Sequence, residues 1–430
     1  MTQNPIQLRI EKPIYGGSGL ARHEGKAIFV PFTLPGEIVE ASITGDHGSY
    51  ANAELFNILE PSPLRATPAC PYYGECGGCH YQHTTYQHQI DIKSQILHES
   101  LERAHIADIP GISTLSSEPL AYRNRIRLHI DRATSQLAYK RRASNQNLIV
   151  TSCPIAAPAL QSALAALQSL APTWQLARHF TEIELFTNSS QDSILISLFT
   201  SIASKPAILA LQSLWPQLHT AIPKLAGVAL VSVDNPRQPG KLIAHHGHSS
   251  LTYHTAGHPY RVTAGSFFQV NRFLIDPLVE HVTQSASGTL VWDLYAGVGL
   301  FSAALTSRFQ QVIAVESAPS SVHDLRHNLR GTASRVVAST TLDFLRRAPQ
   351  KARPDFVIVD PPRSGLGKQV ATLLAAARPA HITYVSCDPA TLSRDIKSLL
   401  DSGYHLDSIG MVDLFPQTFH LESVAALSLK

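Results

Sequence analysis

The sequence predicts a multidomain α/β protein with three parts, and three observations carry this prediction. Residues 1–61 hold short apolar runs separated by turn signals, the pattern of a small β-barrel. A proline-rich linker and a cysteine cluster follow, and beyond them strands mix with one alanine-rich helix at 156–171, as in an α+β domain. From about residue 260, apolar strands alternate with helical segments, which predicts a doubly wound, Rossmann-like sheet. We therefore expect domains at 1–61, 62–255 and 256–430.

Length and composition bound the class of protein. A chain of 430 residues is too long for one compact core, and 44% hydrophobic with 16% charged residues is the balance of a folded globular protein. The formal net charge of +3 permits a nucleic acid partner without requiring one. The sequence holds no run of roughly 18 apolar residues, and its first residues lack a basic stretch followed by an apolar core. We expect a cytoplasmic monomer with no membrane partner.

The N-terminal segment is expected to form an OB-like barrel, a frequent platform for nucleic acids. Its four Lys and Arg residues stand against seven Asp and Glu residues, so its charge does not favour RNA binding over a purely structural role. Both interpretations stay open. Beyond the linker, residues 84–104 carry an approximate helical stripe of Ile and Leu that opens at Thr84. We expect this helix to pack against the C-terminal domain.

A basic segment spans residues 122–142. It carries seven Lys and Arg residues against one acid, Asp131. The first three arginines alternate along the chain, so on a strand they would share one face. One interpretation is a solvated sheet edge, and the other is a surface that contacts RNA phosphates. The candidate RNA contacts, here and in a later loop, are Arg123, Arg125, Arg127, Arg141, Arg142 and Arg363.

The five cysteines are unevenly distributed. Cys70, Cys76 and Cys79 lie within ten residues, Cys153 follows far downstream, and Cys387 stands alone. An odd, clustered set in a chain without a secretion signal argues against disulfides and favours metal binding or catalysis. The first four thiolates suit either tetrahedral zinc or a [4Fe–4S] cluster, and the residues alone do not choose between them.

The first motif of the C-terminal part predicts a nucleoside site. An apolar strand ends at Asp293, and a Gly297-Val-Gly299 turn then leads into a helix. Glu316 ends the next strand, 23 residues after Asp293, where a carboxylate can accept hydrogen bonds from ribose hydroxyls. No third glycine completes the dinucleotide pattern. Adenosine without pyrophosphate, and hence S-adenosylmethionine, fits better than a nicotinamide cofactor.

Two further motifs follow the next strands of the same predicted sheet. Asp360-Pro-Pro-Arg363 would lie beside the cofactor, in a loop type that also occurs in enzymes that methylate exocyclic amines. Cys387 ends the following strand, where a thiol can be accessible. Thiolate addition to carbon 6 of uracil turns carbon 5 into a nucleophile, so a cysteine here favours methylation of that carbon. Glu422 interrupts an apolar strand and is the candidate base for the carbon 5 proton, with a solvent-facing residue as the alternative.

Taken together, the chain resembles the RNA uracil-C5 methyltransferase family over nearly its whole length. The motifs that match, in the family's order, are Cys70-Pro-Tyr-Tyr-Gly-Glu-Cys76-Gly-Gly-Cys79, Tyr122-Arg-Asn-Arg125, Gly265-Ser-Phe-Phe-Gln269-Val-Asn271, Asp293-Leu-Tyr295, Asp360-Pro-Pro-Arg363-Ser-Gly365, Ser386-Cys387-Asp388-Pro389 and His420-Leu-Glu422. The N-terminal barrel is similar to the TRAM domain that many members carry. The resemblance implies a [4Fe–4S] cluster on Cys70, Cys76, Cys79 and Cys153, with zinc as the less favoured metal.

The resemblance also assigns residues to the reaction. It implies that Cys387 is the nucleophile and Glu422 the proton acceptor. The implied contacts to S-adenosylmethionine, with the two glycines of the turn, are Gln269, Tyr295, Gly297, Gly299, Glu316, Asp343 and Asp360. Leu300 departs from members that carry a polar residue after the second glycine. Barrel and cluster together are more usual in enzymes that act on ribosomal RNA than on transfer RNA, so 23S ribosomal RNA is the favoured partner, with the same chemistry on a transfer RNA uridine as the alternative.

Two other functions remain open at this stage. The Asp360 loop would serve an amine N-methyltransferase, which needs no thiol. A non-catalytic RNA-binding factor could keep the fold without the chemistry. Both differ from a uracil-C5 methyltransferase in that neither depends on Cys387.

Overall fold

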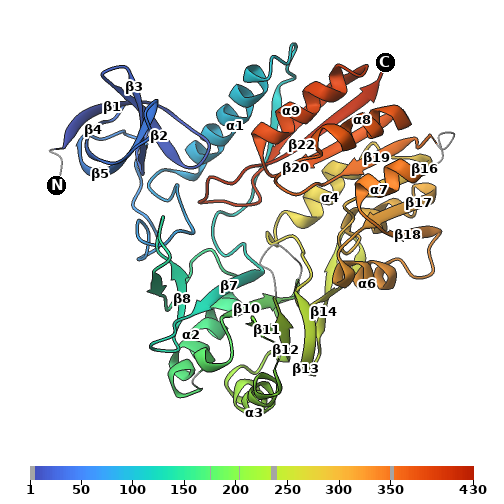
Figure 1. Ribbon diagram of the computed structural model, residues 1–430, viewed down its shortest axis with the longest axis horizontal. Coiled ribbons are helices and arrows are strands. Elements are labelled where there is room, and N and C mark those ends of the chain that lie inside the picture. The colour runs from blue at the N-terminus through green and yellow to red at the C-terminus, as the bar shows by residue number, and fades with distance from the viewer. Residues whose placement is uncertain (1–4, 175, 203, 234–239, 349–352) are drawn as a thin grey trace.

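The protein, seen here as a computed structural model, has three parts (Figure 1). A β-barrel lies at the upper left of the view, the C-terminal α/β part at the upper right, and the central part below them. None of the described helices is long and apolar enough to cross a membrane. The structure describes residues 5–174, 176–202, 204–233, 240–348 and 353–430.

The N-terminal part is a closed five-stranded barrel, which confirms the sequence prediction for residues 5–61 and leaves residues 1–4 outside the described chain. Alternating side chains such as Leu8, Ile10 and Val30 point inward and fill its interior. The strands follow the order β1-β2-β3-β5-β4, with bounds Ile6–Pro13, Ser18–His23, Lys26–Pro31, Tyr50–Glu60 and Ile38–Asp46.

The central part is a seven-stranded sheet covered by two helices. Every residue of β11 is buried, because helices pack on one face and the C-terminal part packs on the other. The strand order is β13-β12-β11-β10-β7-β8-β9, with bounds Lys241–Gly247, Leu225–Ser232, Ile194–Thr200, Glu182–Thr187, Arg125–Ile130, Leu137–Lys140 and Asn147–Ile149. The helices are α2 (Pro158–Trp174), the short η1 (Leu176–Arg178) and α3 (Lys205–Ala221).

The sequence predicts only the first of these helices. α3 begins after Ser204, whose side chain accepts a hydrogen bond from the backbone of Ala207. Pro216 lies inside the helix and breaks the local pattern from which a helix would be recognised.

The C-terminal part contains an eight-stranded sheet, and its parallel core confirms the doubly wound prediction. The chain starts this core at β16 and builds outward in both directions, so the point where the order reverses lies between β16 and β19. The strand order is β18-β17-β16-β19-β20-β22-β21-β6, with bounds Ser334–Ala338, Phe309–Glu316, Gly288–Leu294, Phe356–Val359, His381–Ser386, Glu422–Leu429, Tyr404–Val412 and Ile112–Leu115. The helices are α4 to α9, at Ile275–Thr283, Leu300–Leu305, Pro319–Asn328, Thr341–Arg347, Gly367–Ala377 and Pro389–Leu400.

Segments from the predicted central domain join the C-terminal part. β6 runs parallel to β21 and forms the outer edge of the large sheet. α1 (Tyr86–Arg103) buries its apolar stripe in the same core and lies between the barrel and the red C-terminal elements of Figure 1. The hairpin of β14 (Ser250–Thr255) and β15 (His258–Thr263) spans the boundary expected at 255/256. The unit expected at 62–255 is therefore divided between two cores.

A buried ion pair joins α1 to the loop between β21 and β22. The Lys93 ammonium lies 2.6 Å from a carboxylate oxygen of Asp413 and donates to the carbonyl of Phe415 at 3.0 Å. Both charged side chains are at most 1% exposed. Burial lowers the pKa of Lys93, and Asp413 opposes this shift. Each buried charge is therefore stabilised only while its partner is present.

Removal of one partner tests this dependence. We expect Lys93→Met to lower the free energy of unfolding by about 3–5 kcal/mol, because Asp413 is left as an unpaired buried charge. Lys26→Met is the control, since the Lys26–Asp46 pair lies at the surface and its loss should change little. Thermal unfolding of the two variants beside the parent measures the difference. Equal midpoints for both variants would contradict the assignment.

Candidate active site

The carboxyl ends of four neighbouring strands bring the predicted site residues to one edge of the sheet. In the parallel register Leu294 pairs with Val315 and with Val359, so Tyr295, Glu316 and Asp360 follow side by side. The backbone N–H of Asp360 donates to the carbonyl of Leu294, which continues the pairing past the strand end. This edge lies at the reversal of strand order, where ligands bind in open α/β sheets.

The loop after β16 has an unusual backbone. Tyr295, Gly297 and Gly299 all adopt left-handed conformations, with φ of 66°, 55° and 93°. A side chain at position 299 would meet Leu325 at 2.7 Å, so glycine is required there for space as well as for conformation. Tyr295 adopts its left-handed backbone although it is not a glycine, and such strained residues often occur at ligand sites.

Glu316 holds this loop in place. One carboxylate oxygen accepts the backbone N–H of Gly297 at 2.9 Å, and the other accepts those of Ser317 and Ala318. Behind the loop, Asp293 is 1% exposed and accepts a hydrogen bond from Ser302, while its second oxygen has no partner among the described residues. Burial raises the pKa of Asp293 to about 6, Ser302 opposes the shift, and Glu316 adds to it.

The other predicted cofactor residues surround this loop. Asp360 follows β19, and burial, with Asp293 as the second cause, raises the pKa of its carboxyl to about 7. Gln269 is buried, and its carbonyl accepts a hydrogen bond from the side chain of Asn124. Asp343 lies in the first turn of α7, where Thr340 donates to its carboxylate. All lie on the C-terminal part, and Asp343 is the most exposed of the three.

Cys387 occupies the turn between β20 and α9. Asp388 caps that helix by accepting the N–H groups of Ala390 and Thr391, which fixes the turn. Burial raises the pKa of the Cys387 thiol to about 11, and Glu422 and Asp360 raise it further, whereas Arg363 lowers it. The resting side chain is therefore a protonated thiol whose ionisation depends on the charges around it.

Glu422 lies opposite Cys387. The antiparallel register pairs Ser386 with Ser423, and its next step sets Cys387 against Glu422. Glu422 is 4% exposed, and burial raises its pKa well above the ordinary range, with Asp360 adding to the rise and Arg363 opposing it. The strand register and the effect of Glu422 on the pKa of Cys387 therefore indicate that the thiol and the carboxyl lie near each other.

The barrel contributes a residue that the sequence did not predict. Tyr15, in the turn between β1 and β2, donates its hydroxyl to the carbonyl of Cys387 at 3.2 Å. Its ring meets Phe419 edge to face at 5.4 Å, and burial raises its pKa to about 12. The two partners are 372 residues apart, so no local pattern could have indicated the contact.

The loop before Glu422 is held from two directions. The carbonyl of Gln417 accepts the N–H groups of His80 and Tyr81, which directly follow Cys79. The side chain of Gln89 on α1 exchanges hydrogen bonds with Gln417. The cysteine segment and α1 therefore position the loop that leads to Glu422.

The predicted metal site is not shown by the structure. Among the described residues, no group of three or more His, Cys, Asp or Glu side chains is placed to hold a metal ion. All five cysteines are free thiols. Burial raises the pKa of Cys76 and Cys153, and raises that of Cys79 to about 12, with neighbouring cysteines, Cys70 among them, adding to each rise. The four thiols of the predicted site thus lie within electrostatic reach of one another.

Most of the arginines predicted to contact RNA have partners within the protein. The side chain of Arg125 is 12% exposed, pairs with Glu184 and stacks on Phe186. Arg123 lies beside Cys153 and lowers the pKa of that thiol, although burial raises it by more. Three others form exposed or half-exposed ion pairs: Arg127 with Glu182, Arg141 with Glu75 and Arg142 with Glu54. Arg363 is exposed beside the active site, where it donates to His420 at 3.3 Å.

Comparison with known proteins decides the family. A model described as tRNA (uracil-5-)-methyltransferase matches residues 85–342 and 350–430, and a TRAM domain model matches residues 6–56. The chain belongs to this methyltransferase family. It is an RNA (uracil-C5)-methyltransferase that uses S-adenosylmethionine, and its barrel is a TRAM domain.

Curated relatives match over nearly the whole chain. An "Uncharacterized RNA methyltransferase" of Aquifex aeolicus is 30% identical and covers 100% of both chains. A "23S rRNA (uracil(1939)-C(5))-methyltransferase RlmD" of Vibrio parahaemolyticus is 30% identical over 97% of this chain and 94% of its own. Among solved structures, the Pyrococcus abyssi tRNA (uracil-54, C5)-methyltransferase bound to S-adenosyl-L-homocysteine superposes with a TM-score of 0.77 at 23% identity, covering 98% of this chain and 100% of its own, which shows the fold.

The raised pKa of Cys387 gives a pH prediction. Below a pKa of about 11, the thiolate fraction rises tenfold per pH unit, so alkylation of Cys387 by iodoacetamide should rise from pH 7 to 10 without a plateau. We expect Arg363→Met to slow alkylation at each pH, because Arg363 lowers this pKa, and Arg326→Met on α6 to leave it unchanged. Mass spectrometry of the Cys387 peptide measures the rates. A rate that begins to level off between pH 9 and pH 10 would show an unperturbed thiol, with a pKa of about 9.

Proposed function

We propose that the protein methylates carbon 5 of a uridine in 23S ribosomal RNA through a covalent bond between Cys387 and carbon 6 of the base. The observation that supports this proposal is the pairing of Ser386 with Ser423 between β20 and β22, next to which Cys387 and Glu422 lie, with Glu422 raising the pKa of Cys387. A nucleophile and a proton acceptor in one small space are what methylation at carbon 5 needs and methylation of an amine does not.

The methyl donor fits the neighbouring strand ends. We assign Glu316 to the ribose, Asp343 to the adenine and the Gly297–Gly299 turn to close approach of the backbone. Gln269, Tyr295 and Asp360 would line the methionine side, nearest to Cys387. When bound, S-adenosylmethionine supplies an electrophilic methyl group on a positively charged sulfur. That charge would favour the ionised forms of the nearby acidic groups.

The residues of the chain then carry the remaining steps. The Cys387 thiolate would add to carbon 6, and the electron pair released to carbon 5 would form the bond to the methyl group, whose bond to the sulfur of the donor breaks and leaves its electrons on that sulfur. Glu422 accepts the proton that carbon 5 still carries, and the bond between sulfur and carbon 6 breaks to return the thiolate. Tyr15 and the Asp388 cap keep the Cys387 turn in position throughout.

The target base must leave its stack to reach Cys387. Phe267 is 62% exposed and lies two residues before Gln269, so a large apolar ring faces solvent beside a predicted cofactor residue. An exposed aromatic ring is suited to stack on a base. Exposed Arg363 can contact a phosphate near the same place.

Ribosomal RNA is favoured as substrate by the relatives. Four relatives at 30% identity, which match 97% or more of this chain, carry the name 23S rRNA (uracil(1939)-C(5))-methyltransferase. The Pyrococcus abyssi structure, at 23% identity, is a transfer RNA enzyme. Methylation assays on unmodified 23S fragments and on transfer RNA transcripts separate the two, and methylation of transfer RNA alone would overturn the ribosomal assignment.

We propose further that Cys70, Cys76, Cys79 and Cys153 hold a [4Fe–4S] cluster. The donor set is purely thiol, as such clusters prefer, and buried Arg123 supplies a positive charge beside Cys153. A structural zinc ion is the alternative. Protein purified without oxygen should contain iron and acid-labile sulfide in equal amounts. Zinc without sulfide would refute the cluster.

Substitutions at the two central residues test the mechanism. Cys387→Ala should abolish methyl transfer while S-adenosylmethionine still binds, since no bond to carbon 6 can form. Glu422→Gln should slow turnover about 10²–10⁴-fold and accumulate the covalent protein–RNA species, because the carbon 5 proton stays in place. Radiolabelled methyl incorporation and denaturing gels measure both. Normal turnover by Cys387→Ala would favour an amine N-methyltransferase instead, and no methylation by the parent protein would favour a non-catalytic RNA-binding factor.

A further inference from the structure

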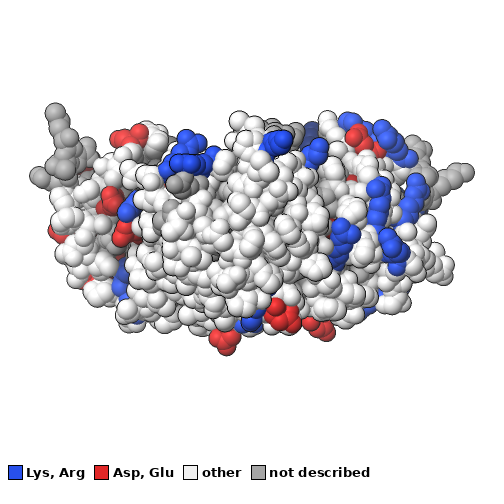
Figure 2. Space-filling model, turned by 90° about the horizontal axis from the view of Figure 1, so that it is seen from below, with Lys and Arg blue, Asp and Glu red and all other residues white. Residues whose placement is uncertain are grey.

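The central part contains a large basic pocket far from Cys387. Its cavity volume is about 1170 Å³, and none of its 17 lining residues is acidic. Three loops at one end of the central sheet form it: the β7–β8 turn, the segment of η1 that leads into β10, and the β11–α3 loop. Figure 2 views the molecule from the side of the central part and shows basic side chains along the upper edge and toward the right of this face, with scattered acids.

Two arginines make this pocket different from the rest of the basic segment. Among the described residues, neither Arg132 nor Arg178 forms an ion pair or hydrogen bond, and both are exposed. The arginines on the neighbouring strand face have such partners, as Arg127 has in Glu182. An arginine left without a partner in a concave surface retains its full capacity to bind an anion.

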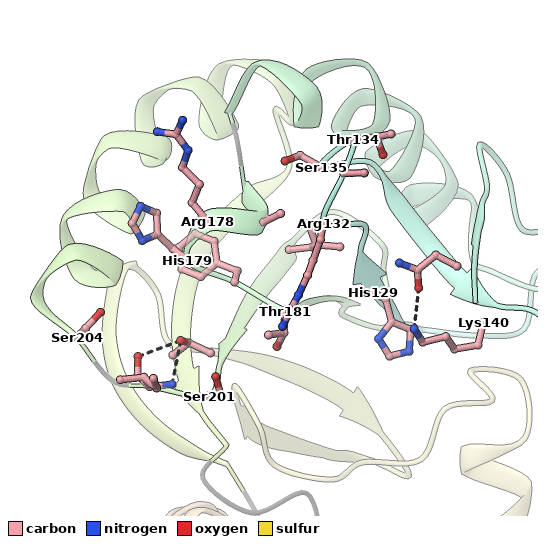
Figure 3. A pocket seen from close by; sticks show the side chains of 17 residues that line it. His129, Arg132, Thr134, Ser135, Lys140, Arg178, His179, Thr181, Ser201 and Ser204 are labelled. Atoms are coloured by element: carbon pink, nitrogen blue, oxygen red, sulfur yellow. Dashed lines mark hydrogen bonds between the residues drawn. The ribbon is translucent and has the colours of Figure 1, made fainter. Parts of the chain in front are cut away.

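The residues around these two arginines supply further hydrogen-bond donors, and few negative charges compete with an anion there. Figure 3 shows Arg132 between His179 and Arg178 on one side and His129 and Lys140 on the other. Hydroxyl groups complete the lining, from Thr134, Ser135, Thr181, Thr200, Ser201 and Ser204. The nearest carboxylates are engaged: Asp131 accepts from Asn147 and from the turn backbone, and Glu182 accepts from Arg127 and lies 3.1 Å from His129.

We propose that this pocket binds the phosphodiester backbone of the RNA substrate at a second point, remote from the target base. The inference rests on the proposed function. Arginines, hydroxyls and imidazoles are the side chains that contact phosphates, and the volume exceeds what one phosphate ion would fill. The pocket lies at the far end of β7 from Arg125, which touches the catalytic part through the carbonyl of Ser266.

The position predicts which RNAs reach it. Five residue steps along β7 cover about 17 Å, so the pocket lies well away from the catalytic part and the bound phosphates belong to nucleotides several positions from the target base. A trimmed RNA that holds only the target loop would not extend to the pocket. The pocket therefore contributes to selection among long, folded RNAs and leaves the chemical step alone.

The test is the double variant Arg132→Ala/Arg178→Ala in the full-length protein. We expect about tenfold weaker binding of a long 23S fragment near 150 mM salt, and a log–log salt slope smaller in magnitude by about 1.5–2, as for two lost phosphate contacts. KM for the long RNA should rise with kcat and the KM for S-adenosylmethionine unchanged. On the trimmed RNA the variant should match the parent. The control is Arg103→Ala/Lys397→Ala, which removes two ion-paired surface charges.

Three outcomes would overturn the proposal: an unchanged affinity and salt slope on long RNA, an equal loss on trimmed RNA, or an equal loss in the control. Thermal unfolding of each variant confirms that these exposed positions leave the fold intact. Failure here differs from failure of the proposed function, because the parent protein's methylation of the same RNA is measured alongside. If the parent protein methylates the RNA and the double variant binds that RNA equally well, only the role of the pocket is refuted.

Discussion

The antiparallel pairing of β22 between β20 and β21 is the constraint on which the site depends. It inserts the last strand of the chain into the sheet so that Glu422 begins opposite the end of β20, where Cys387 lies. A parallel strand would end at that edge and would bring only the loop that follows it to the site, whereas the antiparallel β22 begins there. The cofactor edge of β16, β17 and β19 then stands directly beside the thiol and the carboxyl.

Three other parts of the molecule support that arrangement. α1 contacts the loop before β22 through Lys93 and Gln89. The cysteine segment donates hydrogen bonds to Gln417 in the same loop, and Tyr15 of the barrel donates to the carbonyl of Cys387. The active site is thus shared by the barrel, the cysteine segment and the catalytic sheet. The cysteine segment is thereby connected by hydrogen bonds to the loop that leads to Glu422.

The sequence predicts the strand-end residues well, for a physical reason. Glu316, Asp360 and Cys387 each follow an apolar strand, and parallel strands align their carboxyl ends. Contacts between segments that are distant in the sequence could not be predicted from it. Tyr15 contacts Cys387 across 372 residues, and β6 joins a sheet that is built mainly from the other end of the chain. Likewise, the register of β7 against β10, which pairs Arg125 and Arg127 with acids, cannot be read from a run of arginines.

The account's central claim is a covalent bond between Cys387 and carbon 6 of the target uridine. The most direct measurement incubates the protein and S-adenosylmethionine with 23S fragments that carry 5-fluorouridine, because a base cannot remove fluorine from carbon 5 and the intermediate is trapped. The account predicts a protein–RNA adduct that survives denaturation, is absent in Cys387→Ala, and maps to one uridine. Methylation of ordinary RNA by the parent protein, with no adduct on the fluorinated RNA, would contradict it.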